Sequence, residues 1–564
     1  MSEAEISDLV HRAVSGAAEE LGLDAIPDPS EIEISRPRQK EHGDYATNVA
    51  LALAARLGRN PREVAEVIVG HLPPSEHVAR AEVAGPGFIN LTMEHGWLHR
   101  VLEDVERLGR EYGRVDVGAG ERVQVEFVSA NPTGPLHVGT GRNAAVGDAL
   151  ASVLDAAGFR VEREYYVNDA GTQAAVFAAS LEARYLQRFG REAEVPEGGY
   201  HGEYLRDLAA EVAGDLGDAL LELPADERLA RLREEGIRRS LDAIRATLDR
   251  FGVGFDTWFH ESELHESGRV HQAIELLKER GVAYGADGAI WFESTRYGDD
   301  KDRVLVRASG EPTYLAPDCA YLREKFARGF DRAIYVWGAD HHGYIKRVLG
   351  AAQAFGYDPD RVEFIITQLV ALYRGREPVK MSKRAGDIVT LDELLDEVGV
   401  DAARYTLLTR SPDTPLDFDI ELVASQTLDN PVYYVQYAHA RISSIIRYAE
   451  EQGVGLVPFE ETPVELLTHD AELDLLRKVS ELPEQVTLAA NLRAPHRLTR
   501  FAEELAATFH RFYTECRVVT DDEGLTRARL LLAAATRRTI ANVLGLLGVS
   551  APESMERLRS EEGT

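Results

Sequence analysis

From Arg122 onward, short runs of β-branched and aromatic residues alternate with longer stretches of helical pattern. Strands separated by helices are typical of βαβ units, in which the strands lie parallel. An alanine-rich helix is expected over residues 141–157. The expected strands are 123–128, 161–167, 289–292, 304–306, 333–337 and 364–371. The pattern therefore predicts an α/β domain with a Rossmann-like parallel sheet.

The regions on either side of this alternation follow different patterns. Helical periodicity over 5–21 and 97–108 surrounds a strand-like run at 88–92, which predicts a small N-terminal α+β domain. After about residue 421 only long amphipathic helices are expected, as in an all-α bundle. The expected domains are 1–117, 118–420 with a charged helical insertion at about 185–260, and 421–564.

Composition narrows the classes of protein that fit. A chain of 564 residues, 44% hydrophobic, can bury several cores. It lacks an apolar run of about 18 residues, and its acidic start is unlike a secretory signal, so we expect a cytoplasmic protein without a membrane span. Two cysteines far apart argue against a disulfide framework and against structural zinc. The net charge of −32 argues against a nucleic-acid partner, although phosphate binding requires only local positive potential.

The first candidate site is the loop 129–140, between an expected strand and the helix 141–157. A glycine-containing turn that enters a helix offers free N–H groups to a phosphate, and His137 adds a donor. The same segment could be an ordinary loop with a surface histidine. It also contains Gly139-x-Gly141-x-x-Ala144, and Glu162 and Glu164 follow at the spacing of a ribose ligand. A nicotinamide dinucleotide is therefore an open alternative.

The second candidate site is Val379-Lys380-Met-Ser-Lys383-Arg-Ala-Gly386. Two lysines three residues apart in a short loop suit the negative charge that develops on a polyphosphate leaving group. A solvated basic turn is the simpler interpretation of the loop alone. A dehydrogenase has no use for such a pair, so the two segments together favour ATP chemistry.

These two segments resemble the signature motifs of class I aminoacyl-tRNA synthetases. The wider sequence is similar to the arginyl-tRNA synthetase family from end to end. The similarity is carried by Glu126-Phe-Val-Ser-Ala-Asn-Pro-Thr-Gly-Pro-Leu-His137, Tyr165-Tyr-Val-Asn-Asp-Ala-Gly171, Pro312-Thr-Tyr-Leu-Ala-Pro-Asp318, Lys380-Met-Ser-Lys-Arg-Ala-Gly386, Asn430-Pro-Val-Tyr-Tyr-Val-Gln-Tyr-Ala-His439 and Leu547-Gly-Val-Ser-Ala-Pro552.

The resemblance implies a two-step reaction. Arginine would attack the α-phosphate of ATP, and the arginyl-adenylate would then esterify the terminal ribose of tRNA(Arg). Mg²⁺ would arrive with ATP, bound mainly through phosphate oxygens. His137, Lys380 and Lys383 would be catalytic. The implied ATP-binding residues are His137, Gly139, Thr140, Gly338, Asp340, His341, Met381, Ser382 and Lys383.

One residue departs from the family pattern. The first motif usually ends in a second histidine, whereas this sequence has Thr140. A hydroxyl can donate one hydrogen bond but cannot become a cation, a difference on the order of 1–3 kcal/mol for a contact with a charged phosphate. The departure puts the role of residue 140 in doubt more than it does the reaction.

Histidines and acids raise the question of a metal site. Asp340, His341 and His342 are adjacent, and neighbouring side chains on extended backbone point to opposite faces, so joint ligation is awkward. The histidines of the 260–271 segment lie among Glu261, Glu263 and Glu266, which indicates a polar surface. We expect no protein-bound metal.

Arginine selection requires acceptors for a planar guanidinium with five donors. The resemblance assigns this to Tyr314 and Asp318, with Asn131 near the backbone of the amino acid. Asn168, Asp169 and Gln173 are weaker candidates. Each of them could equally be a helix cap or a turn residue.

The RNA contacts are harder to predict. The resemblance implies an N-terminal domain that contacts the tRNA elbow and a helical domain that binds the anticodon. Aromatic residues at helical spacing are usually core, so the candidates are individually weak. They are Arg36, Arg38, Lys40, Tyr434, Arg497, Arg500, Arg511 and Tyr513.

Three alternatives stay open, namely another class I synthetase, an NAD-dependent oxidoreductase and a catalytically silent RNA-binding paralogue. We expect a monomer, and family habit suggests that activation requires bound tRNA.

Overall fold

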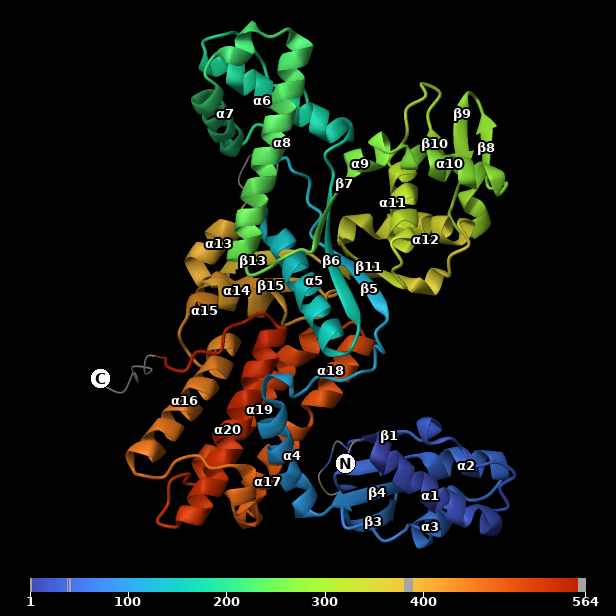
Figure 1. The fold of residues 1–564 in the computed structure, drawn as a ribbon, viewed down its shortest axis with the longest axis vertical. Coiled ribbons are helices and arrows are strands. Elements are labelled where there is room, and N and C mark those ends of the chain that lie inside the picture. Colours follow the sequence, from blue (N-terminus) through green and yellow to red (C-terminus); the bar gives the residue numbers. More distant parts are fainter. Residues whose placement is uncertain (1–2, 38, 40–41, 380–388, 556–564) are drawn as a thin grey trace. The chain divides into compact units, whose positions relative to one another are not determined.

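Five parallel strands form the central sheet, as the alternating pattern predicts (Figure 1). The computed structural model describes residues 3–37, 39, 42–379 and 389–555. The strand order is β12-β11-β5-β6-β7, so the chain builds outward from β5 in both directions. The strands are β5 (Arg122–Glu126), β6 (Arg160–Val167), β7 (Thr257–His260), β11 (Arg332–Gly338) and β12 (Val362–Thr367).

Helix α5 (Val138–Ala156) lies directly against this sheet. Most of its residues are buried on all sides, which its many alanines and glycines permit. A Cβ at Gly147 would clash with the ring of Phe127, so only glycine allows the helix to come this close. The helix starts three residues before the expected position because His137 caps it.

Three α-helices separate β6 from β7, namely α6 (Gly171–Arg188), α7 (Glu203–Leu216) and α8 (Ala225–Arg250), with a short 3-10 helix before α8. Helical structure was expected here, but strand β7 was not. Its short aromatic run follows a long charged stretch and so has a weak strand pattern. Trp258 and Phe259 of β7 stack on Tyr165 and Tyr166 of β6, with ring centroids 4.3 and 6.2 Å apart.

The prediction that 289–292 and 304–306 join the parallel sheet is wrong. Together with β8 (Ala283–Ala286), the strands β9 (Ala289–Phe292) and β10 (Arg303–Val306) form a separate antiparallel sheet. Asp287 and Gly288 make a tight turn with φ of 51° and 76°. Such a turn joins only antiparallel strands, because a parallel pair needs a crossover.

A helical layer packs beside these antiparallel strands. It comprises α9 (Glu261–Glu266), α10 (Arg269–Glu279), α11 (Leu315–Ala327), a short 3-10 helix η6 (Ala339–Tyr344) and α12 (Ile345–Ala354). Buried apolar side chains of the four α-helices form one core with residues of β11 and β12, and Tyr344 of η6 packs against it. This core fixes the helices that contribute to the candidate site.

The predicted strand 364–371 is two strands. β12 ends at Thr367, and β13 (Val370–Arg374) pairs with β14 (Glu377–Pro378) and β15 (Leu416–Asp419) in a third sheet. Helices α13 (Leu391–Val398), α14 (Val400–Leu407) and α15 (Ile420–Ala424) accompany this sheet.

The N-terminal region is α+β, as expected. Its antiparallel sheet has the order β1-β2-β4-β3. The elements are α1 (Glu3–Leu21), β1 (Ile34–Ser35), β2 (Tyr45–Thr47), α2 (Val49–Leu57), α3 (Pro61–Gly70), β3 (Val78–Ala84), β4 (Phe88–Met93) and α4 (His95–Leu108).

Beyond Asp419 the described residues contain helices and no strand, which confirms the predicted all-α C-terminal part. The long helices are α16 (Pro431–Glu451), α17 (Asp470–Ser480), α18 (Leu482–Asn491), α19 (His496–Glu515) and α20 (Glu523–Leu546). Within the parts of the chain that the structure describes, none of the helices has the length and apolar character of a membrane span.

Contacts divide the chain into two units. One contains Met1–Arg110, Ser444–Glu481 and Thr508–Arg538. The other contains Glu111–Ser443, Leu482–Ala507 and Thr539–Thr564, and includes the parallel sheet.

Candidate active site

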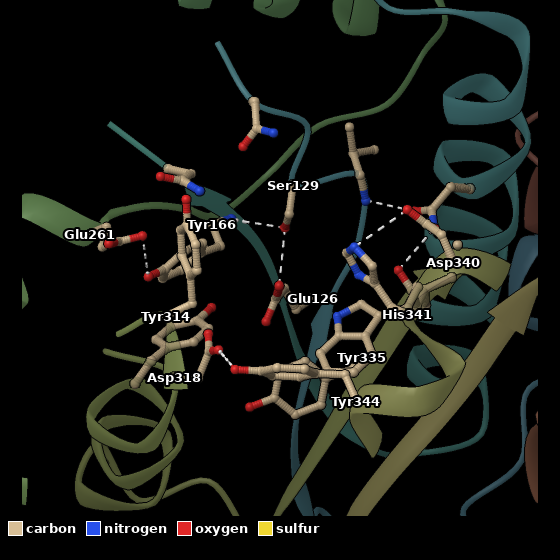
Figure 2. A pocket seen from close by; sticks show the side chains of 18 of the residues that line it. Glu126, Ser129, Tyr166, Glu261, Tyr314, Asp318, Tyr335, Asp340, His341 and Tyr344 are labelled. Carbon is tan, nitrogen blue, oxygen red and sulfur yellow. Dashed lines mark hydrogen bonds and ion pairs between the residues drawn. The ribbon is translucent and has the colours of Figure 1, made fainter. Parts of the chain in front are cut away.

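A cavity of about 530 Å³ opens at the carboxyl ends of the parallel strands. Its lining includes the residues that follow β5, β6 and β11. The strand order reverses between β11 and β5, which is where open α/β sheets bind ligands. Figure 2 shows the side chains that converge on this space.

The turn after β5 has an unusual backbone. Val128 and Ser129 both have positive φ, 66° and 39°. A β-branched residue rarely adopts this conformation, which costs free energy and is concentrated at functional sites. The Ser129 hydroxyl donates to Glu126 Oε1 (3.1 Å) and accepts from the Tyr166 amide (3.1 Å), so it holds the ends of β5 and β6 together (Figure 2).

Asn143 of α5 joins three strand ends. Its Oδ1 accepts from the Val128 amide at 2.6 Å. Its Nδ2 donates to the Val336 carbonyl at 2.9 Å and lies 3.4 Å from the Thr367 hydroxyl. One buried amide therefore fixes the ends of β5, β11 and β12 beside the cavity.

Three of the carboxylates that line the cavity come from β5, α9 and α11, and we call this group the acidic end. Glu126 ends β5, Glu261 begins α9, and Asp318 lies in the first turn of α11 (Figure 2). Glu126 is neutralised by the fully buried Lys325, whose Nζ lies 2.9 Å from Oε2. Burial lowers the pKa of Lys325, although Glu126 opposes that shift.

The other two carboxylates have weaker compensation. Tyr166 donates to Glu261 Oε2 (3.0 Å), and burial raises the pKa of Glu261. Tyr344 donates to Asp318 Oδ2 (2.6 Å), yet burial raises the pKa of Asp318 to about 7, with Glu261 and Glu126 adding to the effect. Among the described residues no lysine or arginine forms an ion pair with Asp318. The acidic end therefore favours a cationic ligand.

Several predicted amino-acid-binding residues line the same cavity. Asn131, Asn168 and Gln173 are there, and the Asn131 amide donates to Gln173 Oε1 at 2.6 Å. Tyr314 lies just before α11 and is 51% exposed at the mouth. The structure brings these side chains to the same cavity as the acidic end.

Asp169 is placed differently, because it does not line the cavity. Its carboxylate accepts from His260 Nδ1 (2.8 Å) and from the amide and hydroxyl of Ser262 (3.0 and 2.9 Å). Burial raises its pKa, but these hydrogen bonds outweigh that effect and lower the pKa overall. Asp169 thus joins the end of β6 to the start of α9.

Three of the predicted nucleotide-binding residues lie in what we call the β11 turn, Gly338 to His341. Gly338, Asp340 and His341 line the cavity opposite the acidic end (Figure 2). A Cβ at Gly338 would lie 2.7 Å from Asp340 Oδ1, so a larger residue there would displace the exposed Asp340 side chain. The Asp340 side chain is 81% exposed, and its Oδ2 lies 3.6 Å from His341 Nε2.

Metal ligation has no support in the described residues, where no group of three histidine, cysteine, aspartate or glutamate side chains could hold an ion. The expectation that the 260–271 segment is simply a polar surface is wrong for Glu261. Its side chain is buried and lines the cavity, because α9 starts immediately after a strand of the sheet.

His137 caps α5 and lies close to residue 140. Its Nδ1 accepts from the Thr140 amide, and its Nε2 lies 3.3 Å from the Thr140 hydroxyl. Gly139 lies under the ring, since a Cβ there would be 3.1 Å from His137 Cε1. The threonine hydroxyl therefore contacts the first motif's histidine directly.

The two motif segments approach each other at their described ends. His137 forms an isolated antiparallel bridge with Thr390, and the Leu391 amide donates to the Leu136 carbonyl at 2.8 Å. Lys380, Met381, Ser382 and Lys383 lie outside the described residues. Thr390, soon after them in the chain, lies beside the start of α5.

The two carboxylates that suggested a dinucleotide site, Glu162 and Glu164, already interact with other side chains. Glu164 is buried and accepts from the Tyr321 hydroxyl, and Arg328 lies 2.6 Å from it. Glu162 accepts from Thr257 at 2.9 Å. Neither carboxylate is presented to a ribose.

The predicted RNA contacts on described residues are mostly paired within the protein. Arg36 donates to the Tyr45 hydroxyl (2.9 Å) and to Ser480 (3.2 Å), while Arg38 and Lys40 lie outside the described residues. Arg500 pairs with Glu504 at 2.8 Å.

The remaining RNA candidates are also held by neighbours or partly buried. Arg511 pairs with both Asp474 and Glu515, each at 2.9 Å. Tyr434, Arg497 and Tyr513 are half-buried. Arg500 and Arg511 therefore form ion pairs within the protein that phosphate would have to replace.

Sequence reasoning missed several side chains of this site. The missed residues include Glu126, Ser129, Asn143, Tyr166, Glu261 and Tyr344. Glu126 and Tyr166 lay inside quoted motifs, which was a usable signal. Asn143 sits in an alanine-rich helix and Glu261 in a charged run, so only the fold shows their positions.

Comparison with known proteins agrees along the whole chain. Residues 4–93 match the arginyl tRNA synthetase N terminal domain. Residues 107–442 match the catalytic domain of class I (R) tRNA synthetases, and 435–555 match the DALR anticodon binding domain.

Relatives and solved structures point to the same family. An arginine–tRNA ligase of Moorella thermoacetica is 52% identical over 544 residues, covering 96% of this chain and 97% of the relative. One of Heliobacterium modesticaldum is 50% identical and covers 98% of each. Thermus thermophilus arginyl-tRNA synthetase has the same fold, with a TM-score of 0.75 at 24% identity over 98% of this chain and 100% of that chain. This chain belongs to the arginine–tRNA ligase family of class I aminoacyl-tRNA synthetases.

Proposed function

We propose that this chain ligates L-arginine to tRNA(Arg) through an arginyl-adenylate, consuming ATP and releasing AMP and pyrophosphate. The observation that carries the proposal is the acidic end of the cavity, facing the β11 turn across a space of about 530 Å³. A guanidinium and an α-amino group supply the positive charge that these carboxylates favour.

The arginine substrate occupies the acidic end in this proposal. Asp318 and Tyr314 receive the guanidinium, and Asn131 with Gln173 lies near the backbone of the amino acid. Asn168 is a further contact. Asp169 acts indirectly, because its carboxylate is already held by His260 and Ser262.

ATP occupies the opposite side. Gly338, Asp340 and His341 receive the ribose, and the turn at His137, Gly139 and Thr140 receives phosphate. Mg²⁺ comes with the nucleotide and is held mainly by phosphate oxygens. Lys380, Met381, Ser382 and Lys383 complete the site, with both lysines on the leaving pyrophosphate. The bridge between His137 and Thr390 supports this arrangement.

The chemistry consists of two displacements. A carboxylate oxygen of arginine attacks the α-phosphorus, and the bond to the β-phosphate oxygen breaks. A ribose hydroxyl of the tRNA then attacks the activated carbonyl carbon, and AMP leaves. The protein contributes mainly positioning and charge stabilisation.

The tRNA is received by the N-terminal and helical parts, through Arg36, Arg38, Lys40, Tyr434, Arg497, Arg500, Arg511 and Tyr513.

The proposed domain limits are 1–117, 118–420 and 421–564. We also propose a cytoplasmic monomer. Cys319 and Cys516 are both unpaired and buried, as is common in reducing compartments.

The decisive experiment is aminoacylation of total tRNA with each of the twenty amino acids. Only arginine should be attached, and attachment of another amino acid, or of none, refutes the proposal.

Lys383→Ala should abolish adenylate formation and leave tRNA affinity within about threefold, because the lysine acts on the leaving group. Equal loss of both would mean that the 380–383 segment has been misassigned.

A further inference from the structure

Asp318 has an asymmetric environment. Its Oδ2 accepts from the Tyr344 hydroxyl at 2.6 Å. Glu126 and Glu261 both disfavour its ionised form, and the hydrogen bond from Tyr344 favours it. Tyr344 follows the β11 turn, so it approaches Asp318 of α11 from a different element (Figure 2).

The ring of Tyr344 is held from behind by a cation. The guanidinium carbon of Arg347 lies 4.9 Å from the ring centre, in cation–π contact. Arg347 is one turn further along, in α12, and also lines the cavity. Its buried Nε has no hydrogen-bond partner among the described residues, so the stacking and one long ion pair fix its position.

That ion pair joins Arg347 to Asp299, at 3.9 Å from Nε to Oδ2. Asp299 is almost fully buried and binds Arg303 of β10 through two bonds of 2.7 and 2.8 Å. A continuous row of side chains, Asp318, Tyr344, Arg347, Asp299 and Arg303, therefore runs from the cavity to the antiparallel sheet.

We propose that Tyr344 is a positioning residue for arginine selection, because it fixes the Asp318 carboxylate with Oδ1 free for the guanidinium while Arg347 and Asp299 fix Tyr344. The inference rests on the proposed function and adds the residue that orients its principal acceptor. A fixed, ionised carboxylate suits a planar donor whose hydrogen bonds need a set direction.

The charged and titratable neighbours of Asp318 make Tyr344 difficult to replace. Arg347 contacts the Tyr344 ring and forms its ion pair with Asp299. The groups around Asp318 are Glu126, Tyr166, Glu261, Cys319, Tyr335 and Tyr344. Losing the Tyr344 hydroxyl therefore raises the pKa of Asp318 further, so a larger fraction of the carboxyl is protonated at neutral pH.

The test is steady-state aminoacylation by Tyr344→Phe, with tRNA(Arg), from about pH 6.5 to about pH 8.5. The KM for arginine should rise about tenfold near neutral pH, the effect of one hydrogen bond to a charged group. The kcat and the KM for ATP should stay within about twofold, since the nucleotide side is untouched. The difference from the wild type should shrink as pH rises, because Asp318 ionises in both proteins.

Tyr284→Phe is the matched control. Its hydroxyl also donates to an aspartate, Asp302, at 2.8 Å, but on β8 and outside the cavity. It should leave the KM for arginine unchanged. Arg347→Met should raise that KM about threefold, while Arg347→Lys, which keeps a cation over the ring, should not.

An unchanged KM for arginine in Tyr344→Phe, or a pH-independent loss, overturns the inference. A fall in kcat with both KM values unchanged also overturns it. If Tyr344→Phe does not fold, the Arg347 pair decides, and equal KM values for its Met and Lys variants overturn the proposal. Failure of the wild type to charge tRNA with arginine refutes the proposed function instead.

Discussion

The acidic end and the β11 turn face the same cavity but are built differently. The acidic end uses three side chains from three elements, β5, α9 and α11, each held by a buried hydrogen bond or ion pair. The β11 turn uses consecutive residues, and its Asp340 and His341 side chains are largely exposed. One end depends on tertiary packing and the other on local backbone.

In the proposed function, this difference lets one site combine selective binding of arginine at the acidic end with binding of ATP at the β11 turn. Buried charges discriminate between ligands, because a buried charge that the ligand leaves unpaired costs free energy. A backbone turn at a strand end accepts a nucleotide with few side-chain requirements. Substitutions should therefore have larger effects at the acidic end.

The largest effect is expected for Glu126→Gln. It removes the charge that pairs with the fully buried Lys325, and an unpaired buried cation costs about 3 kcal/mol of unfolding free energy. Urea denaturation of the whole chain measures this. Glu203→Gln, which breaks an exposed pair with Arg206, should change stability by less than about 0.5 kcal/mol. Similar losses of unfolding free energy in the two variants would show that the buried pair of Glu126 contributes no more than a surface pair.

Asp318→Asn should raise the KM for arginine by about a hundredfold, because a neutral amide loses the charge-assisted bond to the guanidinium. The KM for ATP should change little. Since burial raises the pKa of Asp318 to about 7, wild-type arginine affinity should fall as pH drops below neutrality. The Asn variant should lack this pH dependence. A persistent dependence would assign it to another group.

Asn143→Ala tests the hydrogen bonds that hold the strand ends beside both the acidic end and the β11 turn. It removes the hydrogen bonds to the Val128 amide and the Val336 carbonyl, so kcat/KM should fall about tenfold for arginine and ATP alike. Asn491→Ala, at an exposed position on α18, is the control. A selective loss for one substrate would mean that the two ends are held independently.

The smallest effect is expected for Asp340→Asn. The side chain is exposed and competes with water for its partners, so the KM for ATP should rise only about threefold. Initial rates at varied ATP measure this. A loss as large as that of Asp318→Asn would erase the contrast between the two ends.

Much of the fold followed from pattern. The strands at 123–128 and 333–337 and the helix that follows His137 were predicted because each has a strong local signal. The sequence-based expectation failed where the local pattern does not show which strands pair with each other. Strands 289–292 and 304–306 have ordinary strand composition, and only their short connections exclude a parallel arrangement.

The site shows the same limit. Residues beside glycine and proline motifs, such as Asn131 and Gly338, were expected and line the cavity. Glu261 and Tyr344 have no distinctive sequence context, and their role depends on which elements meet. The spacing of residues along the chain does not show which elements meet in the folded protein.

The left-handed backbone at Val128 has one further consequence. Glycine would adopt that conformation without penalty, so a valine there lowers the stability of the native state. Its branched side chain, however, narrows the range of shapes open to the turn in a way that glycine cannot. A glycine at this position would relieve the strain, but it would have more conformational freedom in the unfolded chain and would remove the valine side chain that lines the cavity.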